Sequence, residues 1–327
     1  MRRMRDPAAW ERHQVLLYAL AIAAGAALGL GLPRTAGAME AAITPVLAAL
    51  LFVTFLAVPF RDIGRAVRSG RFLVALAVVN LVIAPIVAFA LSRFVVDDRA
   101  LLLGVLLVLL TPCVDYVIVF AGLAGGDRAR LVASTPLLML AQTILLPLYL
   151  LPMAGEAVLA SVEPGPFVEA FLVLIALPLA LAGVAQWGAS RSSIVDLGQQ
   201  AALTTMVPLM MLTLATVVGS QVAAVAADLP ALLRVVPLYV AFLVLMPLAG
   251  LIVCRMLRLD TPGARSVTFS GATRNSLVVL PLALALPAEL ALAPLVVVTQ
   301  TLIELVGMIV LVRLVPRLLP SRGSVER

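Results

Sequence analysis

Three ionisable side chains lie near the centres of long apolar segments of this chain: Asp115, Arg274 and Glu304. A charge at the centre of a membrane helix costs about 2.5–3.5 kcal/mol on insertion scales, so such residues normally face a cavity or one another. A structural salt bridge from Arg274 to Asp115 or Glu304 would only fasten two helices together. We favour a substrate or proton site, because three such groups exceed what fastening requires.

Helix-breaking residues stand beside these charges in two segments. One segment is interrupted at Thr111–Asp115, which includes Pro112 and Cys113, and the other at Gly271–Ser276. Helix ends exposed at such breaks offer backbone N–H and C=O groups to a polar ligand. A buried cysteine is usually a small hydrophobe, but its position at a break makes Cys113 a candidate ligand.

Other polar residues in apolar segments are interpreted as structural. Asn80, Gln142, Thr143 and Gln300 are expected to make interhelical hydrogen bonds rather than to bind a ligand. Cys254 is expected to pack as an apolar side chain.

The composition indicates that lipid surrounds much of this protein. Of its 327 residues, 63% are hydrophobic and 12% are charged, and the mean hydropathy is +1.15. A soluble domain carries about 25% charged residues, so much of the exterior must face a bilayer. Every basic residue is an arginine, and the arginines are scattered through short loops. The pI near 10.3 therefore does not indicate a nucleic-acid partner.

Several classes of function lack their motifs here. The sequence contains no Walker A, G-x-S-x-G or G-x-G-x-x-G motif, which argues against an ATP-driven pump. A single histidine, two separated cysteines and the lack of clustered carboxylates argue against a metal site, a disulfide framework and hydrolytic chemistry. We predict a protein that is not an enzyme and that uses no cofactor or metal.

Apolar segments of the length that a bilayer requires, about 20 residues per helix, recur along the whole chain. They predict an all-α membrane protein with about ten transmembrane helices. The predicted spans are about 14–32, 41–59, 72–93, 99–121, 131–153, 166–187, 200–222, 231–256, 265–288 and 291–315.

The distribution of arginines predicts the orientation of the spans. With the N-terminus inside, 18 of the 23 basic residues fall on the cytoplasmic side, and Arg34, Arg93, Arg99 and Arg234 fall outside. The outward loops carry acidic residues instead. This asymmetry predicts an even number of helices, cytoplasmic termini and a multi-pass protein of the inner (plasma) membrane.

A loop rich in Glu, Gly and Pro at 154–165 divides the ten spans into two sets of five. An odd number of helices per half gives the halves opposite orientations, as in the inverted repeats of many transporters. We predict a single transmembrane domain over 1–327, with repeat one at about 14–153 and repeat two at about 166–317. The two interrupted spans, the fourth and the ninth, are counterparts in these repeats.

Two short motifs carry a family resemblance. Residues 112–120, Pro-Cys-Val-Asp-Tyr-Val-Ile-Val-Phe, resemble the Pro-Cys motif of the arsenical-resistance (arsenite efflux) permeases. Residues 301–306, Thr-Leu-Ile-Glu-Leu-Val, are similar to the Pro-Leu-(Ile/Val)-Glu-Val-Pro segment of that family. These permeases belong to the bile acid/sodium symporter superfamily, which has a polar break in its ninth helix where this chain has residues 273–276.

The resemblance implies a ten-helix fold with a panel and a core domain, in which the broken helices four and nine cross near mid-membrane. It also implies efflux of As(OH)3 against a proton gradient, with Cys113 as the substrate thiol and Glu304 as the coupling carboxylate. Arsenite is thiophilic and uncharged at neutral pH, so a lone thiol would hold it weakly enough for release. A buried carboxylate could take up and release the exchanged proton.

The chain departs from this family in its charged residues. Arg274 replaces the first of a pair of asparagines and leaves Asn275, and Asp115 replaces a small residue. Sodium-coupled members resemble Glu-Thr-Gly-x-Gln-Asn here, and Ser270 and Arg274 stand in place of its sodium-binding Glu and Gln. Because a fixed guanidinium should exclude sodium, we predict sodium-independent transport, with Arg274 paired to Asp115 or Glu304.

The leading hypothesis is a secondary transporter that exports arsenite or a related trivalent metalloid in exchange for protons. The alternative is a sodium-independent carrier of a small organic anion in the same superfamily, whose carboxylate or sulfonate meets Arg274. The candidate site comprises Cys113, Arg274 and Asn275 for substrate binding, Glu304 and Asp115 for coupling, and Pro112 and Ser276 at the helix breaks. The expected partners are a small-molecule substrate, protons and the lipid bilayer, and no nucleic acid. Both a monomer and a homodimer are compatible with the sequence.

Overall fold

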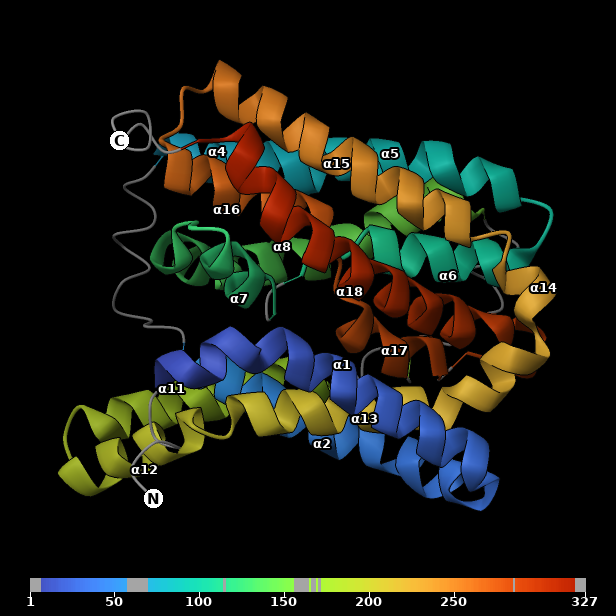
Figure 1. Ribbon diagram of the computed structural model, residues 1–327, viewed down its shortest axis with the longest axis horizontal. Helices are drawn as coiled ribbons and strands as arrows, with labels where there is room; N and C mark the ends of the chain where they lie inside the picture. The colour runs from blue at the N-terminus through green and yellow to red at the C-terminus, as the bar shows by residue number, and fades with distance from the viewer. Residues whose placement is uncertain are drawn as a thin grey trace. The chain divides into compact units, whose positions relative to one another are not determined.

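The described parts of this protein, in the computed structural model, are built from helices joined by short turns and breaks (Figure 1). The structure describes residues 7–57, 70–113, 116–155, 165, 169, 172–284 and 286–320. Within these ranges the backbone forms helices, turns and one isolated β-bridge, between Pro112 and Arg274. The predicted all-α class is confirmed.

Six helical segments of the described chain are long and apolar enough to cross a membrane. They are Pro33–Leu56, Gly70–Val95, Leu172–Ala189, Met206–Ala227, Leu229–Met256 and Leu292–Leu318. Three shorter apolar helices cover Leu16–Gly31, Arg99–Leu109 and Ile144–Ala154. A protein with several membrane spans is therefore confirmed, and the count of ten stays a prediction.

The chain divides into two compact units, and each takes a segment from both predicted repeats. Unit 1 comprises Met1–Ala57 and Gly165–Asp228, and unit 2 comprises Val58–Pro164 and Leu229–Arg327. These units do not coincide with the repeats predicted at 14–153 and 166–317. The inverted repeats and the single domain over 1–327 remain predictions.

Unit 1 is built from helices that approach one another on small residues. Its elements are α1 (Pro7–Gly31), η2 (Pro33–Thr35), α2 (Ala36–Leu56), η6 (Leu172–Ala176), α11 (Leu177–Ala189), α12 (Ser193–Leu203) and α13 (Met206–Ala227). Helix α13 packs against both α1 and α2, and α11 packs against α2. A Cβ atom on Gly25 of α1 would lie 2.3 Å from the carbonyl oxygen of Ala215, so this close approach to α13 requires glycine.

Helix α12 was not predicted, and it separates α11 from the predicted span at 200–222. None of its residues is buried. It ends where the hydroxyls of Thr204 and Thr205 donate to the carbonyl oxygens of Ala201 and Ala202, at 2.7 and 2.6 Å. Threonine side chains compete in this way with helical hydrogen bonding. The long helix α13 therefore begins only at Met206.

Unit 2 contains both interrupted helices. Its elements are α4 (Gly70–Ala77), η4 (Val78–Ile83), α5 (Ala84–Ser92), η5 (Arg93–Val95), α6 (Arg99–Leu109), α7 (Tyr116–Leu123), α8 (Arg128–Ala154), α14 (Leu229–Leu232), α15 (Val236–Met256), α16 (Thr261–Ala272), α17 (Ser276–Leu284), η7 (Ala288–Leu290) and α18 (Leu292–Leu318). The fourth predicted span is split into α6 and α7, and the ninth into α16 and α17. The second break is shorter than predicted, since Gly271 still belongs to α16 and Ser276 opens α17.

A proline shapes the helix that passes beside these breaks. Pro85 has no N–H, so it cannot bond to the carbonyl oxygen of Leu81, four residues earlier. The hydroxyl of Tyr149 on α8 donates to that oxygen at 2.6 Å. The preceding residues, Val78–Ile83, form the π-helix η4, which contains Asn80. Single π-helical turns are frequent at functional sites.

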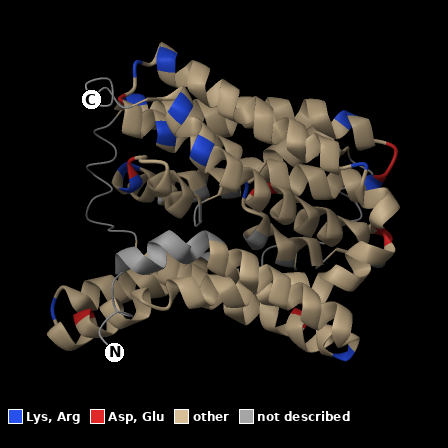
Figure 2. Ribbon diagram, in the orientation of Figure 1, with Lys and Arg blue, Asp and Glu red and all other residues tan. Residues whose placement is uncertain are grey.

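Charged side chains lie mainly near the ends of the helices of each unit (Figure 2). Ion pairs join neighbouring connections at those ends. In unit 2, Arg234 donates to both carboxylate oxygens of Asp97, at 2.6 and 2.8 Å. The pairing with Arg234 lowers the pKa of the Asp97 carboxyl below its ordinary value. Charges confined to helix ends are expected where the helix flanks face lipid.

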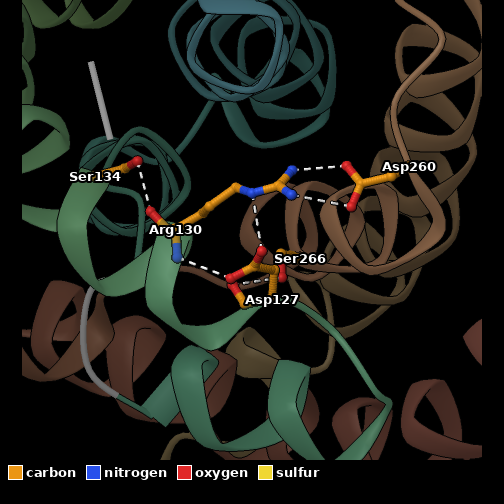
Figure 3. A network of polar contacts seen from close by, with 5 residues as sticks. All are labelled: Asp127, Arg130, Ser134, Asp260 and Ser266. Atoms are coloured by element: carbon orange, nitrogen blue, oxygen red, sulfur yellow. Dashed lines mark hydrogen bonds and ion pairs between the residues drawn. The ribbon is translucent and has the colours of Figure 1, made fainter. Parts of the chain in front are cut away.

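A second polar cluster fastens the turn after α7 to the start of α16 (Figure 3). Arg130 donates to both oxygens of Asp260, at 2.7 and 3.1 Å, and its Nε lies 2.9 Å from Asp127. Asp127 also caps α8, because its side chain accepts from the backbone N–H of Arg130 at 3.0 Å. The hydroxyl of Ser266 donates to the carbonyl oxygen of Asp127 at 3.1 Å, and that of Ser134 to Arg130 at 2.8 Å. Ionic contacts therefore join the start of α8, directly after α7, to the start of α16.

The replacement Asp260→Asn should lower the free energy of unfolding in detergent by about 0.5–1 kcal/mol at neutral pH, because this ion pair is partly exposed. The hydrogen bond from Arg130 lowers the pKa of the Asp260 carboxyl from its ordinary 3.8. The stabilisation from this ion pair is therefore fully present above pH 3.8, the ordinary pKa of the group. It is lost as the pH falls through the lower pKa of Asp260 in the folded state. Thermal unfolding of wild type and variant should differ at neutral pH and converge in acid. The exposed Glu289→Gln is the control, and a variant that matches it at neutral pH would contradict this role.

Candidate functional site

The two breaks of unit 2 pair with each other as short antiparallel strands would. Pro112 bridges Arg274. The N–H of Cys113 donates to the carbonyl oxygen of Thr273 at 3.4 Å, and the N–H of Asn275 donates to that of Thr111 at 2.8 Å. Buried backbone groups need partners, and helix α6 cannot continue through Pro112. Each unwound segment thus supplies hydrogen bonds that the other has lost by leaving the helix.

The guanidinium of Arg274 binds carbonyl oxygens at the C-terminal ends of both half-helices. Its Nη2 donates to Ser270 and Gly271 of α16 at 3.0 and 2.7 Å, and its Nη1 donates to Leu109, the last residue of α6, at 3.4 Å. The last four carbonyls of a helix have no intrahelical donor, and that end carries a partial negative charge. A buried cation bound there satisfies both ends at once.

Asn80 completes the coordination of this guanidinium from the π-helix η4. Its Oδ1 accepts from Arg274 Nη2 at 2.8 Å. Its Nδ2 donates to the hydroxyl of Ser270 at 3.1 Å and to the carbonyl oxygen of Leu76 at 3.0 Å. The interhelical hydrogen bond predicted for Asn80 is confirmed. The sequence analysis did not connect it with Arg274, since nothing in residue type identifies the partner.

Close packing holds Arg274 away from solvent. The side chain is 0% exposed, and its guanidinium carbon lies 5.2 Å from the centre of the Phe242 ring, within the range of a cation–π interaction. A Cβ atom on Gly271 would lie 2.4 Å from a methyl carbon of Val79, so any larger residue would force Val79 to move where α16 meets η4. This contact brings Asn80 within reach of the guanidinium.

Glu304 contacts the second break from the unbroken helix α18. Its Oε2 accepts hydrogen bonds from the backbone N–H of Arg274, at 2.8 Å, and from Nε2 of Gln300. The neighbouring Thr301 donates to the hydroxyl of Ser276 at 2.8 Å. Glu304 is 0% exposed. The carboxylate and the guanidinium therefore belong to one buried junction, and Gln300 bonds within its own helix rather than between helices as predicted.

The remaining predicted site residues lie in or beside the same junction, with one exception. Cys113 is buried in the first break. Asn275 caps α17, because its Oδ1 accepts from the N–H of Val278 at 3.3 Å. Its Nδ2 is buried and has no hydrogen-bond acceptor in the described chain. Asp115 lies outside the described residues, so its pairing with Arg274 and its role in coupling remain predictions.

No group of three or more His, Cys, Asp or Glu side chains placed to hold a metal ion occurs among the described residues. The junction instead combines a guanidinium, a carboxylate, a thiol and exposed ends of half-helices. Interrupted helices whose ends meet at a buried polar site are typical of secondary transporters. The fold and the site together define that class of membrane protein.

A model described as the sodium bile acid symporter family matches residues 44–227, more than half of the chain, and the protein belongs to that family. It is thus a transporter of the sodium/bile acid symporter type. The match runs from α2 to the end of α13 and includes the first break. The second break and α18 lie beyond it. A comparison with curated proteins finds no match.

Arg274→Met should destabilise the protein strongly, because it leaves several buried carbonyl oxygens and Asn80 without a donor. Each such unpaired group costs about 1–3 kcal/mol, so we expect a loss of roughly 3 kcal/mol or more in the free energy of unfolding, measured in detergent. Arg255→Met, at the exposed end of α15, is the matched control and should change stability little. Equal effects of the two replacements would show that the capping contacts do not stabilise the junction.

Proposed function

We propose that this protein exports arsenite or a related trivalent metalloid in exchange for protons, and that it does so without sodium. The observation that carries the proposal is the position of the Arg274 guanidinium on the C-terminal carbonyls of two half-helices. In transporters with interrupted helices, such ends and the unwound carbonyls beside them coordinate the coupling cation. Here a side chain provides the positive charge.

Sodium independence follows from electrostatics. A sodium ion about 4 Å from the guanidinium would be repelled by about 4 kcal/mol at an effective dielectric constant of about 20. The carbonyl oxygens that would coordinate the ion already accept hydrogen bonds from Arg274. The ion would therefore gain few ligands and meet a like charge.

Glu304 is the carboxylate that we assign to proton exchange. It is buried and lies at the break, where its oxygen accepts from the backbone of Arg274. A buried carboxylate is costly to keep charged unless nearby donors and cations stabilise it. Its protonation state is thus sensitive to the occupancy and opening of the junction, which is what coupling requires.

Cys113 is the thiol that we assign to the substrate. It can displace one hydroxyl of As(OH)3: a sulfur–arsenic bond forms, an arsenic–oxygen bond breaks, and the thiol proton leaves with the hydroxyl as water. Arsenic stays trivalent, so no oxidant or reductant is needed. One such bond is reversible, whereas several thiolates would hold the metalloid too tightly for turnover.

The alternative, a carrier of a small organic anion, would need Arg274 to bind the substrate. Three protein oxygens already accept from its Nη2, those of Asn80, Ser270 and Gly271. These contacts weigh against an anion site, and the transport experiment below distinguishes the two substrates.

In inside-out vesicles with an acidic interior, wild type should accumulate arsenite, and Cys113→Ser should reduce the initial rate at least about tenfold. Cys254→Ser is the matched control, since Cys254 is also buried but lies in α15, where its thiol donates to the carbonyl oxygen of Ala264 at 3.7 Å. It should retain the wild-type rate. Uptake of an organic anion without arsenite uptake, or equal rates for both cysteine variants, would reject the metalloid assignment.

Replacement of sodium by choline should leave the rate of arsenite uptake unchanged within about twofold. Glu304→Gln should abolish uptake driven by the pH gradient, because the amide cannot exchange a proton, while the exposed Glu289→Gln retains it. The accompanying proton movement can be followed with a pH-sensitive dye. A requirement for sodium would refute the role of Arg274 as the resident cation.

A further inference from the structure

Gln300 and Glu304 are one helical turn apart on α18, and the amide Nε2 of Gln300 donates to Oε2 of Glu304. An ionised carboxylate only accepts hydrogen bonds, and a protonated one also donates. The observed direction of this hydrogen bond, like that from the N–H of Arg274, suits the ionised form. The orientation of the Gln300 amide therefore depends on whether Glu304 is ionised or protonated.

The other end of the same amide has no partner. Oε1 of Gln300 is buried, the residue is 3% exposed, and no donor in the described chain reaches that oxygen. A second orphan lies at the same junction, the Nδ2 donor of Asn275, one residue after the N–H that binds Glu304. Buried polar groups without partners are rare and call for a ligand or another explanation. An acceptor and a donor together suit a neutral molecule with hydroxyl groups.

Protonation of Glu304 would reverse the amide. The new O–H needs an acceptor, and the oxygen of Gln300 can provide one after its carboxamide turns by about 180°. This terminal torsion is broad and two-fold, so the turn has a low barrier. The NH2 group would then point where Oε1 now points, and an acceptor would become a donor.

Apart from Arg274, the described charged side chains on elements packed against α18 lie at or near the ends of helices. The proton exchange at Glu304 therefore concerns the groups of the junction. The described charged side chains on elements packed against α18, together with the break, are Arg99, Arg255, Arg265 and Arg274. Arg99 begins α6, Arg255 lies in the last turn of α15, and Arg265 donates to the carbonyl oxygen of Leu319 beyond the end of α18. Asp115 lies outside the described residues.

We infer that Gln300 is a substrate-binding residue whose amide oxygen accepts a hydroxyl of the neutral substrate, and that a proton on Glu304 withdraws this acceptor by turning the amide. Proton and substrate then exclude each other, which is the linkage that exchange requires. This inference rests on the proposed function. It extends that function by naming the group that transmits the proton to the substrate.

The test is the pH dependence of As(OH)3 binding to the purified full-length protein in detergent. For wild type, the dissociation constant should rise about tenfold for each unit of pH below the titration of Glu304, the slope for one exchanged proton. Gln300→Met should bind more weakly at high pH and lose the slope, with a change of less than about twofold over the same range. Gln221→Met is the control, since the amide of this buried glutamine on α13 donates to its own neighbour Ser220.

A wild-type slope in the folded Gln300→Met variant would overturn this inference and leave the proposed function intact. Wild type that binds As(OH)3 without any pH dependence would overturn both. If Gln300→Met fails to fold, Gln300→Asn provides the same measurement, because its amide is one methylene too short to reach Glu304. Loss of the slope in that variant supports the relay, and retention rejects it.

Discussion

The structure of unit 2 depends on one constraint: two helices are interrupted in its buried interior, where their unpaired backbone groups cannot bond to water. An unpaired carbonyl or N–H in such surroundings costs several kcal/mol. The breaks meet this cost in three ways, by pairing with each other through Cys113 and Asn275, by the guanidinium of Arg274, and by the capping side chain of Asn275. The contacts of the site therefore serve first to provide partners for the unpaired backbone groups of the two breaks.

The same constraint explains the composition of the surrounding helices. Because Arg274 reaches back over the last turn of α16, its neighbours must provide acceptors and room, which Asn80 and Gly271 do. Because the break also leaves the N–H of Arg274 outside a helix, an acceptor is needed there, and Glu304 provides it. Polar residues that look unrelated in the sequence thus serve one junction.

Much of this could be predicted from the sequence. Hydropathy and Pro112 identified the helical segments and the first break, and charges within apolar runs identified Arg274 and Glu304. The partners of Arg274 could not be predicted, because most are backbone oxygens, which carry no signal in residue type. The orientation of the Gln300 amide toward Glu304 depends on rotamers, and the limits of the second break depend on capping by Asn275.

A cation that belongs to a side chain stays with the chain, and this has an electrical consequence. A dissolved ion that crossed with the substrate would add the energy of its own gradient and about 2.3 kcal/mol for each 100 mV of membrane potential. The buried guanidinium of Arg274 is covalently attached, so no net charge from it has crossed the membrane at the end of a complete cycle. The voltage sensitivity of a complete cycle is then set by the charges of the solutes that come and go.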